Sequence, residues 1–300
     1  MDHPSCCLPA AEPATGRDPR PVVDAPAGLD DPTLVQLPGG TFLMGCEDPG
    51  AYAADGEGPV RDVPVDPFAI EACCVSTARF ARFVDDTGYV TDAERAGTGF
   101  VFAGFLPDDF PDTRGVAAAP WWREVPGADW AHPEGPQSDL AGRADHPVVQ
   151  VSWHDAQQFC GWAGLRLPTE AAWEYAARGG LVQQRFPWGN QLTPGGEHRM
   201  NVFQGRFPDR NTVKDGYAGT APVRAFPPNG FGLHNTTGNV WEWTADPWSV
   251  NGQVSAAERV LRGGSYLCHA SYCWRYRTSA RMASTPDSPT GNVGFRCAAG

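Results

Sequence analysis

The chain has 300 residues and a mass of 32.2 kDa, of which 41% are apolar and 19% charged, so it can build a folded core. Its 35 glycines and 29 prolines exclude a mainly helical or mainly sheet protein, because both residues weaken the interiors of helices and strands. The formal net charge of −12 disfavours nucleic acid as a partner, since phosphates would be repelled.

Targeting signals are the next feature of the sequence. No apolar run approaches the roughly 18 residues of a membrane span, and the first residues lack the basic start and apolar stretch of a secretory signal. We therefore expect a cytoplasmic, monomeric protein without membrane contacts. Nine cysteines are an odd number and too few for a disulfide scaffold.

In chain order, the first predicted unit is a disordered tail over residues 1–33, which contain seven prolines. Residues 34–300 are predicted to form one compact domain. It begins with strand, turn and strand patterns over residues 34–37, 38–40 and 41–44.

Three helices are predicted from N-cap residues, apolar spacing and terminal glycines. They run from Ser76 or Thr77 to Gly88, from Ser152 to Gly164, and from Thr169 to Gly179. The side chains expected to be buried are Phe80, Phe83 and Val84 in the first, Ala156, Phe159, Cys160 and Ala163 in the second, and Trp173, Ala176 and Ala177 in the third. Residues 97–150 and 183–230 show no clear periodicity, and loops of this length are normally functional or tied by a metal.

The sharpest local feature is a cysteine pair, Cys268 and Cys273, which follows Gly263 and Gly264. An extended chain would hold the two Cα atoms roughly 17 Å apart, so the segment must fold back if the sulfur atoms are to meet. Three interpretations remain open: a structural disulfide or unrelated buried thiols, a redox dithiol, and a soft-metal site. Without two more ligands nearby, the pair suits Cu(I) better than tetrahedral zinc.

Five strings in the chain resemble hallmarks of the formylglycine-generating enzyme family, also called sulfatase-modifying factors. They are residues 167–180 (LPTEAAWEYAARGG), 186–189 (FPWG), 238–243 (GNVWEW), 262–265 (RGGS) and 294–296 (GFR). Residues 266–276 (YLCHASYCWRY) resemble the catalytic members in particular. The resemblance spans most of residues 34–300 and implies an α+β fold of the C-type-lectin-like superfamily, with few short helices and strands and much irregular loop.

The resemblance implies an oxidase for sulfatase maturation. Such an enzyme uses O2 and a reductant to convert the cysteine of a Cys-x-Pro-x-Arg segment in an unfolded sulfatase into Cα-formylglycine (3-oxoalanine). It implies Cu(I) held by Cys268 and Cys273, with the substrate thiolate as a third sulfur ligand. Ser265, Tyr272 and Trp241 match residues that line the reaction pocket.

Two structural calcium ions are also implied by the resemblance. Oxygen-rich loops suit Ca2+, although no EF-hand spacing is present and Asp or Asn in Gly-rich loops usually form turns. The implied ligands are Asn201, Val202, Asp215 and Tyr217 for one ion, and Asn235, Gly238, Val240 and Glu242 for the other. Val202, Tyr217, Gly238 and Val240 would provide only carbonyl oxygens.

Five other cysteines lie within residues 34–300. Positions matching Cys160 and Cys297 form a disulfide in secretory-pathway relatives; here either a disulfide or two neighbouring thiols is expected. Cys46, Cys73 and Cys74 are expected to be small buried apolar residues.

Two alternative functions are possible on the same fold. An iron-dependent sulfur–carbon bond-forming module would need a histidine cluster, and the seven histidines are scattered. A lectin-like binding module would leave Cys268 and Cys273 without a role.

Overall fold

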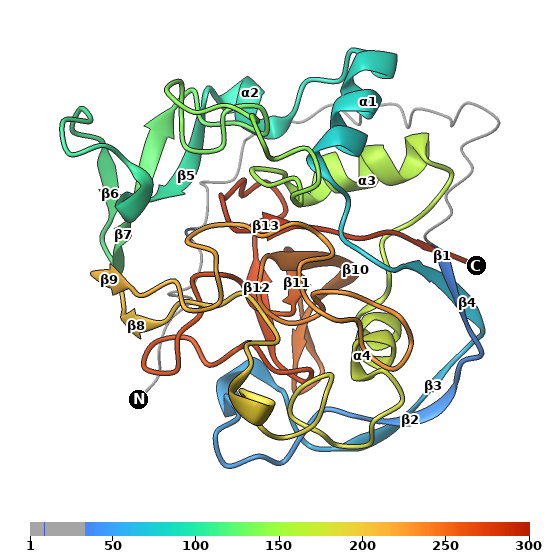
Figure 1. Cartoon of the computed structure of the whole chain (residues 1–300). Helices are drawn as coiled ribbons and strands as arrows, with labels where there is room; N and C mark the ends of the chain where they lie inside the picture. The colour runs from blue at the N-terminus through green and yellow to red at the C-terminus, as the bar shows by residue number, and fades with distance from the viewer. Residues whose placement is uncertain (1–8, 10–33) are drawn as a thin grey trace.

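The computed structural model describes Pro9 and residues 34–300, so the tail predicted to be disordered lies, apart from Pro9, outside the described residues. Short strands and helices alternate with long irregular segments (Figure 1). The strands are β1 (Leu34–Leu37), β2 (Gly40–Met44), β3 (Arg61–Val65), β4 (Phe68–Glu71), β5 (Thr98–Phe102), β6 (Arg114–Val116), β7 (Ala119–Pro126), β8 (Gly205–Arg206), β9 (Arg210–Asn211), β10 (Trp241–Val250), β11 (Gln253–Arg262), β12 (Arg281–Ser284), β13 (Val293–Gly294) and β14 (Ala298–Ala299). The α-helices are α1 (Thr77–Thr87), α2 (Asp92–Ala96), α3 (Trp153–Trp162) and α4 (Glu170–Arg178), and the 3-10 turns are η1 (Ala53–Asp55), η2 (Ala103–Phe105) and η3 (Pro194–Gly196).

The three predicted helices are confirmed as α1, α3 and α4. Each begins where predicted, because the side chains of Ser76, Ser152 and Thr169 accept a hydrogen bond from a backbone N–H in the first turn. Gly88 and Gly179 end α1 and α4 in the left-handed conformation. The predicted inward faces are buried, except that Val84 and Ala163 are only partly covered.

The two predicted strands are confirmed in position. β1 and β2 occupy the predicted residues, yet β1 pairs with β4 and β2 pairs with β3. β4 also pairs with β14, which brings the end of the described chain into the same sheet as its first strand, with β4 between them. The predicted strand–turn–strand unit is therefore not a hairpin, because each strand finds a distant partner.

The absence of regular structure over residues 97–150 was a wrong prediction. Strands β5, β7 and β6 form a three-stranded sheet there, and α2 precedes them with a capping box made by Thr91 and Glu94. β5 is buried along nearly its whole length, so it lacks the alternation of apolar and polar residues that marks a half-exposed strand. Residues 183–230 are mainly irregular, as predicted, and contain only η3, β8 and β9.

A four-stranded sheet in the order β12-β11-β10-β13 occupies the centre of the molecule, with α3 above it in Figure 1 and the β5–β7 sheet to one side. The long hairpin of β10 and β11 carries the buried Trp241 and Trp243. These indoles belong to a large apolar cluster that also contains Phe159 of α3 and Phe295. None of the helices among residues 34–300 is long and apolar enough to cross a lipid bilayer.

Charged residues of the strings that carry the family resemblance meet in buried ion pairs. In α4, Glu174 pairs with Arg262 of β11, and Glu170 pairs with Arg262 at 3.1 Å and with Arg281 of β12 at 2.7 Å. Glu242 of β10 pairs with Arg296 at 2.6 Å between Oε2 and Nε. These pairs fasten α4 and the segment after β13 to the central sheet.

Two buried carboxyl groups, Asp155 in the first turn of α3 and Asp92 at the start of α2, make the stability of the fold depend on pH. Burial, together with the charge of nearby Asp92, raises the pKa of Asp155 from its ordinary value of 3.8 to about 7. A folded pKa above the unfolded one means that the contribution of Asp155 to stability is complete below the unfolded pKa and is lost as pH rises through about 7.

We therefore predict that Asp92→Asn, which removes the neighbouring charge, flattens this pH dependence. Each pH unit by which the folded pKa falls toward the unfolded value should recover about 1.4 kcal/mol of stability at high pH. Urea unfolding at about pH 5 and about pH 8 measures the effect. An equal loss of stability between the two pH values in the variant and the parent protein would contradict the prediction.

Candidate active site

The two predicted thiols meet in the segment between β11 and β12. The Sγ atoms of Cys268 and Cys273 lie 3.0 Å apart, and both side chains are buried. The chain folds back as the spacing required: the N–H of Cys268 donates to the carbonyl of Ser265 at 2.9 Å, and that of Cys273 to the carbonyl of His269 at 2.7 Å. The pair is present as two thiols.

Gly264 explains why the loop closes. Its φ of +75° is a left-handed value that favours glycine, and a Cβ atom there would lie 2.9 Å from the carbonyl oxygen of Arg275. The turn before Cys268 therefore packs directly on the backbone that follows Cys273. The glycine pair brings the two arms of the loop together and, with them, the two sulfur atoms.

The electrostatic surroundings of the sulfur atoms are those of a buried pair that shares a proton. Burial raises the pKa of the Cys268 thiol well above its ordinary value, and the hydrogen bond with Cys273 raises it further. The backbone N–H of Ser265 donates to Cys268 Sγ at 3.4 Å, which favours the thiolate. A cation placed between the sulfurs would take over the role of the shared proton, and a soft ion suits these soft ligands.

Ser265 is held by a chain of buried hydrogen bonds. Its Oγ accepts from Asn292 Nδ2 at 3.0 Å and from the N–H of Leu267 at 3.3 Å. The Oδ1 atom of Asn292 in turn accepts from the Thr290 hydroxyl at 2.9 Å. Two accepting positions of the Ser265 hydroxyl are thus filled, so any further hydrogen bond of this hydroxyl would be one that it donates.

Tyr272 and Trp241 occupy different environments. Trp241 is fully buried in the same apolar cluster as both thiols, and its indole N–H has no hydrogen-bond partner among the described residues. Tyr272 is partly exposed and stacks on Phe207 at 4.3 Å between ring centroids, with Trp121 edge-on at 4.7 Å. Tyr272, Phe207 and Trp121, here called the aromatic patch, form a surface beside Cys273.

Sequence reasoning missed Asn292, Phe207 and Trp121. Asn292 lies two residues before the string at 294–296, so a reading of its neighbours would have drawn attention to it. Phe207 and Trp121 come from β-strand and loop segments far from the cysteines in sequence, and no local pattern connects them with the pair.

The first predicted calcium set surrounds an unpaired oxygen. Asn201 is buried, and its Oδ1 has no hydrogen-bond partner among the described residues, while its Nδ2 donates to the carbonyl of Gly219 at 2.7 Å. Asp215 accepts from the N–H groups of Val202 at 2.9 Å and Tyr217 at 3.1 Å. The structure thus brings Val202, Asp215 and Tyr217 together and leaves on Asn201 an oxygen suited to a hard cation.

The second predicted set is divided. Asn235 also has a buried Oδ1 without a partner among residues 34–300, and its φ is +50°. Glu242, in contrast, accepts two hydrogen bonds on each carboxylate oxygen, from Arg296, Trp173 and Cys74. All four lone-pair positions of Glu242 are occupied, so it could bind calcium only by giving up one of these bonds.

Gly238 brings the two calcium sets close together. A Cβ on Gly238 would lie 2.4 Å from the carbonyl oxygen of Asn201, so the two backbones are in direct contact. Val240 is buried just before β10. No group of three or more His, Cys, Asp or Glu side chains in the described part of the chain converges as a metal site would require. A calcium ion at either set would therefore depend on amide and carbonyl oxygens.

The other cysteines differ in their surroundings. Cys160 and Cys297 are buried thiols with 3.5 Å between their sulfur atoms, which is one of the two arrangements expected. Cys73 and Cys74 are buried as predicted. Cys46 is only partly buried, against the prediction, because it lines a pocket and donates to Glu57 Oε2 at 3.7 Å.

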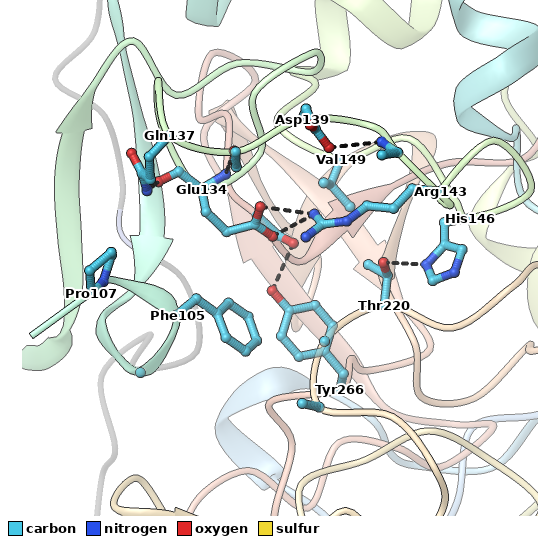
Figure 2. Close-up of a pocket in the computed structure, with 16 residues that line it drawn as sticks. Phe105, Pro107, Glu134, Gln137, Asp139, Arg143, His146, Val149, Thr220 and Tyr266 are labelled. Carbon is cyan, nitrogen blue, oxygen red and sulfur yellow. Dashed lines mark hydrogen bonds and ion pairs between the residues drawn. The ribbon is translucent and has the colours of Figure 1, made fainter.

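A pocket of about 660 Å³ is lined by Tyr266, Glu134 and Arg143 among other residues (Figure 2). Glu134 and Arg143 form an ion pair of 2.7 Å in its lining, and His146 contacts Thr220 at 2.8 Å. Tyr266 is two residues from Cys268, and its hydroxyl donates to the carbonyl of Gly291. Neither thiol lines this pocket, so it is distinct from the candidate active site.

Comparison with known proteins decides the family. The family described as "Sulfatase-modifying factor enzyme 1-like domain" matches residues 20–300. The chain belongs to this family of formylglycine-generating enzymes. A protein of Thermomonospora curvata named formylglycine-generating enzyme is 56% identical over 281 residues, covering 89% of this chain and 93% of the relative.

Two further comparisons set the limits of the family assignment. A mouse protein named inactive C-alpha-formylglycine-generating enzyme 2 is 47% identical, covering 89% of this chain and 86% of the relative. The solved structure of PvdO from Pseudomonas aeruginosa superposes with a TM-score of 0.64 at 26% identity, covering 94% of this chain and 99% of that one. This likeness confirms the predicted fold. The relatives, however, include both a protein named as a formylglycine-generating enzyme and one named as inactive. The residues of the site must therefore carry the argument for activity.

The distance between Cys268 and Cys273 generates a prediction about their redox chemistry. Because their sulfur atoms are already in contact, mild oxidation of the purified protein should join them in a disulfide with little rearrangement. Differential alkylation followed by peptide mapping would detect the bond, and Cys273→Ala is the matched control. The prediction would be contradicted if the same oxidation joined Cys160 and Cys297 while Cys268 and Cys273 were both recovered in alkylated form.

Proposed function

We propose that this enzyme is an oxidase that converts the cysteine of a Cys-x-Pro-x-Arg segment in an unfolded sulfatase into Cα-formylglycine, using O2 and Cu(I). The observation that carries the proposal is the buried thiol pair, with 3.0 Å between its sulfur atoms, in a loop of irregular backbone beside the partly exposed aromatic patch. A binding module has no need of two adjacent buried thiols.

The thiol pair fits Cu(I) by its chemistry. Cys268 and Cys273 provide two soft ligands, and the N–H of Ser265 supports negative charge on the first of them. Bound there, copper would supply the activation of O2 and a position for the substrate thiolate. The overall reaction balances when the substrate thiol, O2, two electrons and two protons give the aldehyde, hydrogen sulfide and water. A thiol reductant is the source of the two electrons.

The surrounding residues bind, orient and exclude water. The Ser265 hydroxyl, which accepts from Asn292, would be free to donate its proton to a reacting group. Trp241 lies in the same buried apolar cluster as the thiols, and its indole N–H, without a partner among the described residues, could donate to a ligand. The aromatic patch offers ring faces of the kind that bind proline in extended peptides. In the proposed substrate, proline lies two positions after the reacting cysteine.

The charge of the protein favours the same substrate. A formal net charge of −12 attracts a segment that carries arginine. An extended, unfolded segment can bring its thiol to a buried pair, whereas a folded domain could not enter. The proposed partner is therefore a sulfatase polypeptide before it folds.

We also propose that calcium supports the fold without taking part in the reaction. The unpaired Oδ1 atoms of Asn201 and Asn235 support this proposal, together with the carboxylate of Asp215. Val202, Tyr217, Gly238 and Val240 would add carbonyl oxygens. Glu242 is the one proposed ligand whose oxygens are already fully used by Arg296 and its other partners.

We predict that the copper-loaded protein oxidises a Cys-x-Pro-x-Arg peptide in air with a thiol reductant, giving an aldehyde that reacts with a hydrazide. Cys268→Ser and Cys273→Ser should each abolish copper retention and turnover, because serine is a hard ligand. Serine in place of the peptide cysteine should abolish the reaction. Replacement of the peptide arginine should raise KM more than it lowers kcat, because arginine lies away from the reacting carbon.

Two measurements would overturn this proposal. One is tight, stoichiometric copper binding by a double variant in which both cysteines are serine. The other is an unchanged cysteine peptide after incubation in air with protein that has kept its copper. Cys46→Ser is a suitable control, since that thiol lies outside the pair.

We predict that a calcium chelator lowers the melting temperature by a few degrees. Ligand binding at a hundredfold excess over Kd stabilises a protein by about 2.7 kcal/mol. Asp215→Asn should lower the melting temperature in calcium and remove the part of the chelator effect that comes from the first ion. Asp209→Asn, on the exposed pair with Arg206, is the matched control. An unchanged melting curve in chelator, with calcium shown to be present beforehand, is the contrary result.

A further inference from the structure

One residue of the N-terminal segment, Pro9, has a defined environment. It is the member of residues 1–33 that the structure describes, and it is buried. The first residues of a domain are normally in water unless they are tied down by contacts. Burial of a single proline in this polar, proline-rich segment therefore calls for a surface that covers it.

The residues around Pro9 repeat most of the proposed substrate motif. The sequence reads Cys7-Leu8-Pro9-Ala10-Ala11, which matches Cys-x-Pro-x-Arg at the cysteine and the proline and has Ala11 in place of the arginine. No other cysteine of the chain is followed by proline two positions later. Residues 7, 8, 10 and 11 lie outside the described part of the chain. The buried residue is thus the proline of the one Cys-x-Pro that the sequence contains.

The aromatic patch has the features of a surface that binds such a proline. Phe207 and Tyr272 stack with 6° between their ring planes, Trp121 stands edge-on to Tyr272, and all three are partly exposed. The indole N–H of Trp121 has no hydrogen-bond partner among the described residues, so it could donate to a carbonyl of a bound segment. Extended proline-containing segments dock on aromatic surfaces of this kind.

The patch also lies at the correct spacing from the thiol pair. Tyr272 directly precedes Cys273 in the sequence. In an extended segment, a cysteine two positions before the proline lies roughly 7 Å from it. A proline on the patch therefore leaves its cysteine within reach of the thiols.

Residues 10–33, which join Pro9 to β1, are long enough to reach any point on the domain. Fully extended, they span up to roughly 80 Å, whereas a domain of this size is roughly 50 Å across. A flexible tether of such length holds the segment at an effective concentration on the order of millimolar. Even weak binding then gives substantial occupancy.

We propose that residues 7–11 bind to the substrate site of their own chain as a pseudosubstrate, with Pro9 on the aromatic patch and Cys7 directed to the thiol pair. This inference rests on the proposed function, because the patch is then the place where the proline of an external segment binds. Ala11 lacks the positive charge of the motif's arginine, so a complete motif displaces the segment. The tail thereby keeps incomplete motifs out of the site.

The experiment measures how tightly the metal-free full chain binds a fluorescent Ser-x-Pro-x-Arg peptide, by fluorescence anisotropy. Serine replaces cysteine in this probe so that it neither reacts nor forms a disulfide. Pro9→Ala should lower the Kd roughly two- to tenfold, which corresponds to a site that the segment occupies for about 50–90% of the time in the parent protein. Ala11→Arg completes the motif and should raise the Kd.

Pro26→Ala is the matched control, since it makes the same change in the same segment outside the motif. It should bind the probe with the Kd of the parent protein. With copper and the cysteine peptide, Pro9→Ala should lower KM by the same factor as it lowers the Kd and leave kcat unchanged. Melting curves show that each variant is folded before its affinity is compared.

The outcomes separate this inference from the proposed function. If the copper-loaded parent protein leaves the cysteine peptide unchanged, the proposed function fails, whatever the Kd values are. If the peptide is oxidised but Pro9→Ala and the parent protein bind the probe equally well, or neither binds it, the pseudosubstrate is refuted. An equal fall in Kd for Pro9→Ala and Pro26→Ala would show that the segment hinders entry without using its motif, and would also overturn the proposal.

Discussion

The fold depends on buried pairs of carboxylate and guanidinium groups. Glu174 with Arg262, Glu242 with Arg296 and Glu57 with Arg277 are all almost completely shielded from water. Removing one partner of such a pair usually costs about 3–5 kcal/mol, because the other charge stays buried without compensation. The short strands and irregular loops could not hold their positions by ladder hydrogen bonds alone. The ion pairs supply the directional contacts that these segments lack.

The same ion pairs help to explain which parts of the fold could be predicted from the sequence. Strings such as residues 167–180 and 294–296 stand out because their charged residues have buried partners elsewhere in the core: Glu174 pairs with Arg262, and Arg296 pairs with Glu242. α1, α3 and α4 were predictable, since caps and terminal glycines act within a few residues. β5 was not, because burial on both faces removes the alternation that marks a strand, and β7 was not, because its buried residues recur every third position and do not alternate. Their position is decided by contacts with distant segments.

The candidate site shows the same division between local and distant information. The meeting of Cys268 and Cys273 could be inferred from their spacing and the glycines before them. Arg275 lies two residues after Cys273 in sequence, yet its hydrogen bond to Asp55 could not be inferred, because the two residues are 220 positions apart. The aromatic patch draws on residues 121, 207 and 272. A family resemblance can point to such positions, but only the folded chain shows which of them touch.

The pairing of β14 with β4 has a consequence for how this protein is made. Residues 298 and 299 complete a sheet whose other strands lie between residues 34 and 71. On a ribosome, β1 and β4 can therefore not gain their third strand until residues 298 and 299 have been made, more than 200 residues later. Arg296 and Cys297 arrive at the same late moment and complete the charge balance of Glu242 and the core beneath α3. Closure of this sheet thus depends on contacts between segments far apart in sequence, which form slowly.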